Sequence, residues 1–297
     1  MTGDRLRAAL RGVRGFVLDA DGVLVLQGAP LPGSMEAVSS LGARSIPFRV
    51  VTNFSQLHRA TLAEWFGRGG LTIDPDRIIT GTSAAAAHTA ARHPGRPIFV
   101  LAAPDARREF VGQHLVTPDE ADAAPPGTVA AVVLGDAGDD LSYRNLDIAF
   151  RLVRGGADLL SMHRNPWWLT PKGETLDAGA FVVGLEFATG RRAQILGKPS
   201  PVVFRQAVAG LQADLGERLP RSVFAMVGDD LRADVAAAQR VGLRGILVLS
   251  GKTTAADAER AVKAARARPS GRPGARAPVR GPDAIAATLA EVVAALD

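Results

Sequence analysis

The chain of 297 residues contains no cysteine. This excludes disulfides, thiolate metal sites and cysteine nucleophiles, and it leads us to expect a reducing, cytoplasmic location. The chain also lacks any apolar run near the ~20 residues that cross a membrane, and it has no internal repeat. Its 47% hydrophobic and 22% charged residues are typical of a globular protein, and its length suits two domains.

Acidic residues are outnumbered by basic ones, and the formal net charge is +5. A basic chain invites binding of nucleic acid, although an anionic substrate would also suit it. Much of the excess positive charge falls in residues 266–282, which argues against a nucleic-acid partner. This Arg-, Pro- and Gly-rich stretch predicts a flexible surface loop before a final helix over 283–296.

Five short apolar runs are each followed at once by polar residues, a pattern typical of strands buried on both faces of a parallel sheet. They cover residues 16–18, 48–51, 193–196, 223–227 and 246–249. Stretches with helical spacing of apolar residues lie between them, at 34–41, 57–67, 202–215 and 233–241. The alternation predicts an α/β fold with a doubly wound, Rossmann-like parallel sheet.

The middle of the chain has predicted elements of its own. Its strands are expected at 97–101, 130–134 and 158–161, and its helices at 84–91, 143–154 and 178–187. We interpret residues 83–189 as an inserted α/β cap domain. Residues 1–82 and 190–297 would then form the Rossmann-like core.

Polar residues stand where four of the five predicted core strands end: Asp19, Thr52, Lys198 and Asp229. Ligands of open α/β sheets bind beyond the carboxyl ends of the strands. The sequence therefore predicts that these four residues converge on one site.

The segment Asp19-Ala20-Asp21-Gly22 follows the first predicted strand. Residues two apart project to the same side of an extended chain, so both carboxylates can serve one site. Asp19 is suited to attack phosphorus, and Asp21 to protonate the leaving oxygen and later activate water. Taken alone, the segment also suits a calcium-binding loop or a simple turn.

Three carboxylates, those of Asp229, Asp230 and Asp234, follow the strand at 223–227. A helix cap needs only one carboxylate, whereas a hard cation binds several carboxylate oxygens. Mg²⁺ suits phosphate chemistry because it neutralises oxygen charge and orients the group for attack. Alternatively, Asp230 and Asp234 cap and pair on the helix.

Thr52 and Asn53 end the second strand, where a hydroxyl, an amide and backbone N–H groups can hold phosphate oxygens. Alternatively, Thr52 or Ser55 caps the next helix. Lys198, at a buried strand end, can pair with the carboxylates and phosphate and favour their ionised forms. An exposed loop lysine is the other interpretation.

These four segments, in this order, resemble the haloacid dehalogenase-like hydrolase superfamily, and more narrowly its subclass IIA of NagD-like and 4-nitrophenylphosphatase-like phosphatases. The motifs span residues 15–251, and the insertion between the second and third motifs matches the α/β cap of that subclass. The resemblance implies a Mg²⁺-dependent phosphatase of small phosphorylated metabolites. It also suggests a homodimer formed through the cap.

The resemblance also implies a role for each motif residue. Asp19 would be the nucleophile and a metal ligand, Asp21 the general acid/base whose backbone carbonyl binds the metal, and Asp229 the third protein ligand. Thr52 and Asn53 would bind the phosphoryl group and Lys198 would stabilise it. Asp230 or Asp234 would support the metal from behind its direct ligands.

A segment of the predicted cap, Arg164-Asn165-Pro166-Trp167-Trp168, resembles a substrate loop of pyridoxal-phosphate and phosphoglycolate phosphatases. We therefore expect Asn165 and Trp168 to contact substrate, although Trp168 can instead pack in the cap core. Trp168 replaces a histidine of that loop, so those substrates are not transferred to this chain. His163 is interpreted as a surface or core histidine.

Two other functions stay open. A phosphotransferase or mutase would use the same aspartyl-phosphate, with a sugar hydroxyl in place of water. A non-catalytic phosphate- or nucleic-acid-binding protein would not need Asp19, Asp21, Lys198 and Asp229 together, and their presence argues against it.

Overall fold

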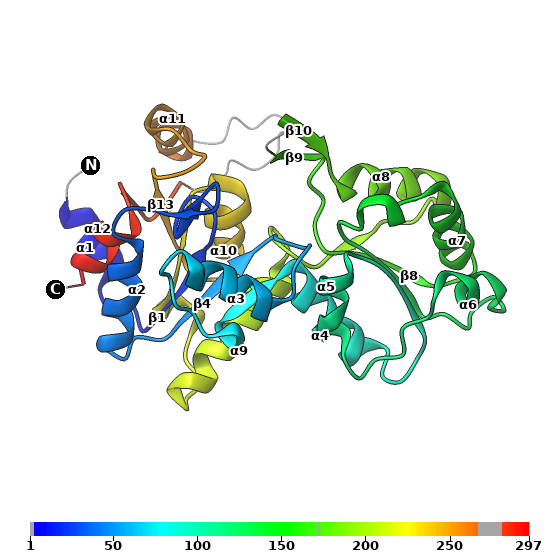
Figure 1. Cartoon of the computed structure of the whole chain (residues 1–297). Helices are drawn as coiled ribbons and strands as arrows, with labels where there is room; N and C mark the ends of the chain where they lie inside the picture. The colour runs from blue at the N-terminus through cyan, green and yellow to red at the C-terminus, as the bar shows by residue number, and fades with distance from the viewer. Residues whose placement is uncertain (1–2, 171–172, 267–280, 297) are drawn as a thin grey trace. The chain divides into compact units, whose positions relative to one another are not determined.

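The computed structural model describes residues 3–170, 173–266 and 281–296. These residues form two compact units, each with its own parallel sheet (Figure 1). Unit 1 contains the described residues up to Thr52, Ala63–Ile78, and those from Phe204 onward, whereas unit 2 contains Asn53–Leu62 and Ile79–Val203. The predicted α/β class is confirmed.

A six-stranded sheet has the order β14-β13-β12-β1-β4-β5, and all of its strands except most of β5 belong to unit 1. They are β1 (Gly15–Asp19), β4 (Phe48–Thr52), β5 (Ile78–Thr80), β12 (Phe224–Gly228), β13 (Arg244–Val248) and β14 (Ala284–Ala286). Parallel neighbours flank β1, β12 and β13. Every residue of β1, β4 and β12 is buried, which explains their continuous apolar runs.

Helices and turns connect these strands. The helices are α1 (Gly3–Leu10), α2 (Ser34–Ala43), α3 (Arg59–Arg68), α9 (Pro201–Leu215), α10 (Ala237–Arg240), α11 (Ala255–Arg266) and α12 (Leu289–Ala294). A small hairpin, β2 (Val25–Leu26) and β3 (Ala29–Pro30), follows β1. The helix predicted over 233–241 begins as a π-helical turn, Leu231–Ala236, before α10. Such turns are frequent at functional sites.

Unit 2 is built on a four-stranded sheet in the order β11-β8-β7-β6. Its strands are β6 (Ile98–Leu101), β7 (Ala131–Leu134), β8 (Asp158–Ser161) and β11 (Gln194–Ile195), and β9 (Trp167–Thr170) with β10 (Gly173–Leu176) forms a separate hairpin. Its helices are α4 (Gly81–Arg92), α5 (Pro104–Arg107), α6 (Pro118–Ala123), α7 (Tyr143–Arg154) and α8 (Ala178–Thr189). The three helices predicted for the middle of the chain are thus confirmed.

Alternate strand residues of this sheet enter two separate cores. Val132 and Leu134 pack with α7 and α8, whereas Ala131 and Val133 pack with α4. Figure 1 shows α7 and α8 on one side of the sheet and α4 on the other. A sheet covered on both faces needs apolar residues at every strand position, as its burial shows.

Two of the predicted elements were wrong. The strand at 193–196 was expected in the core sheet, but β11 pairs with β8 in unit 2, and Leu196 lies in a core of that unit. The helix over 283–296 is instead β14 followed by α12, because residues 284–286 pair with β13 and Thr288 caps a new helix. The local sequence pattern indicates that each segment is apolar, but it does not indicate which strand the segment pairs with.

Among the described residues, no helix is both long and apolar enough to span a membrane. The predicted loop at 266–282 lies almost entirely outside the described residues.

Candidate active site

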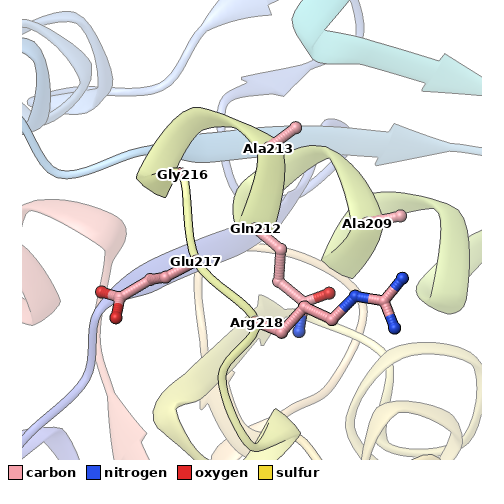
Figure 2. Close-up of a pocket in the computed structure, with 6 residues that line it drawn as sticks. All are labelled: Ala209, Gln212, Ala213, Gly216, Glu217 and Arg218. Atoms are coloured by element: carbon pink, nitrogen blue, oxygen red, sulfur yellow. The ribbon is translucent and has the colours of Figure 1, made fainter.

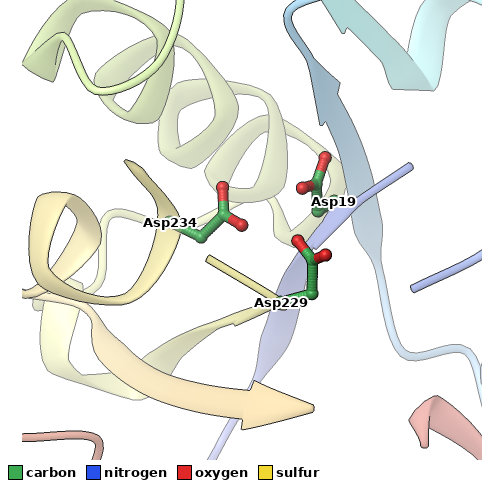
Figure 3. Close-up of side chains that lie close together, drawn as sticks. All are labelled: Asp19, Asp229 and Asp234. Atoms are coloured by element: carbon green, nitrogen blue, oxygen red, sulfur yellow. The ribbon is translucent and has the colours of Figure 1, made fainter. Parts of the chain in front are cut away.

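Three buried carboxylates converge in unit 1 (Figure 3). Asp19, Asp229 and Asp234 each contribute an oxygen, and these oxygens lie within 4.8 Å of one another. Their residues are only 6%, 7% and 0% exposed. Three buried negative charges repel one another strongly unless a cation or protons offset them, and oxygen-only ligands are those that hard divalent cations prefer.

The sheet register brings the first two of these residues together. Leu18 is paired with Val227, so Asp19 at the end of β1 lies beside Gly228, which precedes Asp229. The chain order changes side between β1 and β12, because β4 and β5 lie on one flank and β13 and β14 on the other. Such a switch point leaves a crevice for ligands at the carboxyl ends of the strands.

Asp234 reaches the trio from the π-helical turn after β12. Its carboxylate accepts a hydrogen bond from the Asp230 backbone N–H at 3.1 Å. A side chain at Gly228 would overlap the Asp234 side chain, so glycine is required where the strand passes it. The sequence marked Asp234 as a supporting residue, and the structure places it in the trio itself.

Asp229 is held by the loop after β13. Its Oδ2 accepts the Lys252 backbone N–H at 2.6 Å, and its carbonyl accepts the Thr253 N–H at 3.2 Å. The Ser250 hydroxyl donates to the Gly22 carbonyl at 2.7 Å, which ties this loop to the turn after β1. These bonds orient the carboxylate toward the other two acids.

Gly22 has no room for a side chain, and we expect Gly22→Ala to impair metal binding. Its φ is +77°, and a Cβ there would collide with the Asp229 carboxylate. Gly12 is a matched control, because its φ is +73° and a Cβ added there would meet nothing within 4 Å. Both substitutions should cost about 1–2 kcal/mol of stability for the left-handed backbone. Only Gly22→Ala should also raise the metal concentration needed for half-maximal activity; equal metal titrations would contradict this.

The carboxylate of Asp230 has different hydrogen-bond donors from that of its neighbour Asp229. Its Oδ1 accepts the N–H groups of Arg232 and Ala233, and its Oδ2 accepts the Lys252 ammonium at 2.6 Å. Burial by itself would raise the pKa of Asp230, but these donors outweigh it and hold the pKa below its ordinary range. Asp230 is therefore an ionised helix cap beside the trio.

The other predicted residues of unit 1 are Asp21 and Thr52. Asp21 is exposed and starts the turn after β1, where the Gly22 N–H donates to the Val25 carbonyl at 2.7 Å. Thr52 is 2% exposed and is the last residue of β4, the direct neighbour of β1. Both thus lie at the carboxyl ends of two neighbouring strands, β1 and β4.

Asn53 and Lys198, 145 residues apart, meet in unit 2. The Asn53 amide oxygen accepts the Lys198 backbone N–H at 2.8 Å, and the amide nitrogen donates to the Lys198 carbonyl at 3.0 Å. Lys198 is only 6% exposed. The Asn53 side chain therefore fixes the Lys198 backbone.

Asn165 and Trp168 also lie in unit 2. The Asn165 carbonyl accepts the Gly179 N–H at 3.0 Å, next to the start of α8. Trp168 is half-buried in β9, opposite Thr175 of β10, while its neighbour Trp167 is 51% exposed.

A surface depression elsewhere in unit 1 holds none of the predicted site residues (Figure 2). It lies at the end of α9 and is lined by Ala209, Gln212, Ala213, Gly216, Glu217 and Arg218. It gathers no cluster of acids or nucleophiles. The buried carboxylate trio is the stronger candidate.

Comparison with known proteins adds independent findings. A family model described as haloacid dehalogenase-like hydrolase matches residues 16–115, and one described as HAD-hydrolase-like matches residues 195–292. Haloacid dehalogenase-like hydrolase domain-containing protein 2 of Bos taurus is 33% identical over 256 residues, covering 85% of this chain and 90% of that protein.

Two further proteins are similar over most of the chain. The phospholysine phosphohistidine inorganic pyrophosphate phosphatase of Homo sapiens is 33% identical over 254 residues, covering 84% of this chain and 87% of that protein. The crystal structure of a 4-nitrophenylphosphatase from Thermotoga maritima matches with a TM-score of 0.79 and 29% identity, covering 97% of this chain and 99% of that one. The resemblance stated from the motifs is thereby confirmed.

Proposed function

Because the chain belongs to the haloacid dehalogenase-like hydrolase family, we propose that it is a Mg²⁺-dependent phosphatase that forms an aspartyl-phosphate on Asp19. The observation that carries this proposal is the buried trio of Asp19, Asp229 and Asp234. Relatives named as phosphatases support the class, a phosphoric monoester hydrolase. Small phosphorylated metabolites are the proposed substrates.

The trio fits a divalent cation. Its three carboxylates are buried, and only oxygen atoms are offered. We assign Asp19, Asp229 and the backbone carbonyl of Asp21 as direct ligands, with Asp234 beside them. Mg²⁺, when bound, offsets the carboxylate charge and polarises the phosphoryl oxygens.

The chemistry of the two steps follows from Asp19 and Asp21. An Asp19 carboxylate oxygen attacks phosphorus, and an oxygen–phosphorus bond forms as the ester bond to the leaving group breaks. Asp21 donates a proton to the leaving oxygen, so an alcohol departs. Asp21 then accepts a proton from water, which attacks phosphorus and releases inorganic phosphate and the Asp19 carboxylate.

Phosphate binding is assigned to Thr52, Asn53 and Lys198. The Thr52 hydroxyl and the Asn53 backbone N–H would donate to phosphoryl oxygens, and the Lys198 ammonium would offset their charge. Asn165 and Trp168, in residues 83–189, would contact the leaving group. We propose that this region acts as a cap that selects substrates.

A homodimer is also proposed, on the exposed apolar residues of α8. Val183 and Phe187, one helical turn apart, are 45% and 92% exposed. A second copy of the chain would cover them, and light scattering after size-exclusion chromatography measures the mass that decides this.

The proposal is tested by hydrolysis of p-nitrophenyl phosphate with Mg²⁺ and with a chelator. We expect activity only with the metal. Asp229→Ala should lower activity and raise the Mg²⁺ concentration for half-maximal activity by at least ~10-fold. An unchanged Mg²⁺ titration would remove Asp229 from the ligand set. Phosphate transfer to an added alcohol, without phosphate release, would indicate a phosphotransferase instead.

A further inference from the structure

Unit 2 contains a buried polar cluster around His163, which the proposed reaction does not use. His163 is 2% exposed, and its Nε2 lies 2.9 Å from the Ser55 hydroxyl and 3.7 Å from Asp177 Oδ1. The Ser55 hydroxyl also accepts the Asp136 backbone N–H at 3.4 Å. Four segments that are distant in sequence therefore meet at one histidine: residue 55, the end of β7, the end of β8 and the start of α8.

The cluster does not have the geometry of a nucleophilic triad. In a triad the carboxylate bonds the ring nitrogen opposite the serine, whereas Asp177 lies near the same Nε2 that faces Ser55. Nδ1 instead faces the Asn165 backbone N–H at 3.5 Å, and in the neutral tautomer in which Nδ1 accepts this N–H, Nε2 carries the proton. His163 is thus arranged to donate to Ser55.

Ser55 belongs to the 53–56 segment (Asn53, Phe54, Ser55 and Gln56), and its neighbours are anchored in the same unit. Gln56 donates to Asp136 Oδ2 at 2.5 Å, and Thr82 donates its hydroxyl to the Ser55 carbonyl at 3.2 Å. Two residues before Ser55, the Asn53 amide makes its paired bonds to the Lys198 backbone.

We propose that His163 is a positioning residue that, through Ser55, holds the 53–56 segment and with it the Asn53 amide against the Lys198 backbone. The effect on catalysis rests on the proposed function of Lys198, whereas the effect on the segment itself does not. His163 fixes the backbone from which Lys198 is presented, although it touches no reacting group.

The charge of His163 adds a pH dependence. Burial lowers the pKa of His163 from its ordinary value of about 6.5, against the opposing carboxylates of Asp177 and Asp136, the charged groups that face it. The unfolded chain therefore binds this proton more readily. Stability from His163 is full above about pH 6.5 and decreases as pH falls toward the lowered folded pKa. Burial raises the pKa of Asp177, so the stability contribution of Asp177 changes with pH in the opposite direction.

The test compares His163→Leu, His163→Gln and Ser55→Ala, with His93→Leu as the matched control. His93 is another largely buried histidine of unit 2, and its Nε2 lies 3.1 Å from Asp158, a residue outside the His163 cluster. The measurements are kcat, KM and Mg²⁺ half-saturation with p-nitrophenyl phosphate, and backbone hydrogen exchange of peptides covering residues 53–56. Ser55→Ala removes a single hydroxyl, so it keeps the test valid if His163→Leu fails to fold.

We expect His163→Leu and Ser55→Ala each to lower kcat roughly 10- to 100-fold, with Mg²⁺ half-saturation unchanged and faster exchange at 53–56. His163→Gln, whose amide can still donate to Ser55, should restore most of kcat and remove the loss of stability that His163 causes below about pH 6.5. The double variant His163→Leu/Ser55→Ala should have a kcat no lower than that of either single variant, because both substitutions remove the same interaction.

A folded Ser55→Ala protein with wild-type kcat and wild-type hydrogen exchange would overturn the proposal. The proposal would also be overturned if the kcat reductions of the two single variants multiplied in the double variant. Equally fast exchange at 53–56 in His93→Leu would show general loosening and would also overturn it. If the wild type hydrolyses no phosphate ester, the proposed function fails, while the exchange measurements still decide the positioning role.

Discussion

Asp19→Asn is expected to abolish release of phosphate from p-nitrophenyl phosphate, lowering kcat by at least roughly 10³-fold. The substitution keeps the shape of the side chain but replaces a carboxylate with an amide, which is a poor nucleophile. It also removes one of the three buried charges of the trio. Nucleophilic attack and metal binding are therefore weakened together.

The measurement has two parts. Steady-state hydrolysis with saturating Mg²⁺ gives kcat, and acid quenching followed by peptide mass spectrometry detects phosphate on Asp19 in the wild type. Asp4→Asn is the control, because Asp4 is an exposed acid of unit 1 whose side chain is 90% exposed. Wild-type kcat in Asp19→Asn, or a phosphopeptide that does not contain Asp19, would contradict the assigned nucleophile.

Asp214→Asn is expected to lower the free energy of unfolding by about 3 kcal/mol, the largest stability effect foreseen for this chain. Arg49 is a buried cation of β4, and its guanidinium binds Asp214 at 2.6 and 2.8 Å. It also donates to the carbonyls of Gly210 and Phe48. Loss of the carboxylate leaves a buried guanidinium without its counter-charge.

Arg49 and Asp214 differ in exposure to solvent, so the stability costs of replacing each of them can be compared. The Arg49 side chain is 10% exposed and that of Asp214 is 32% exposed. Arg49→Leu should therefore cost less than Asp214→Asn, because water can reach the carboxylate that remains. Asp119→Asn, in the exposed pair with Arg144, should leave stability unchanged. Urea unfolding of each variant measures these differences, and an equal effect of all three variants would contradict the argument.

The same pair also predicts a pH dependence. The hydrogen bond from Arg49 is the main cause that lowers the pKa of Asp214. A carboxyl with a lowered folded pKa contributes stability above its unfolded value of about 3.9 and loses it as pH falls toward the folded pKa. The stability difference between wild type and Asp214→Asn should therefore narrow below about pH 4.

The sequence by itself determined the α/β class and the residues that end the central strands. Buried parallel strands need continuous apolar residues, and the polar residues just after them must lie at one edge of the sheet. Asp19 and Asp229 follow such strands, so their meeting could be predicted without coordinates. Motif order also sufficed to identify the family.

Tertiary structure alone decided the rest. Sheet membership of β11, the pairing of β14 and the entry of Asp234 into the trio depend on contacts between segments that are distant in sequence. The same is true of the Asn53 amide on Lys198 and of His163 beside Ser55. A local sequence pattern shows which residues are apolar and at what spacing they recur. A hydrogen bond between distant residues depends instead on how the whole chain packs.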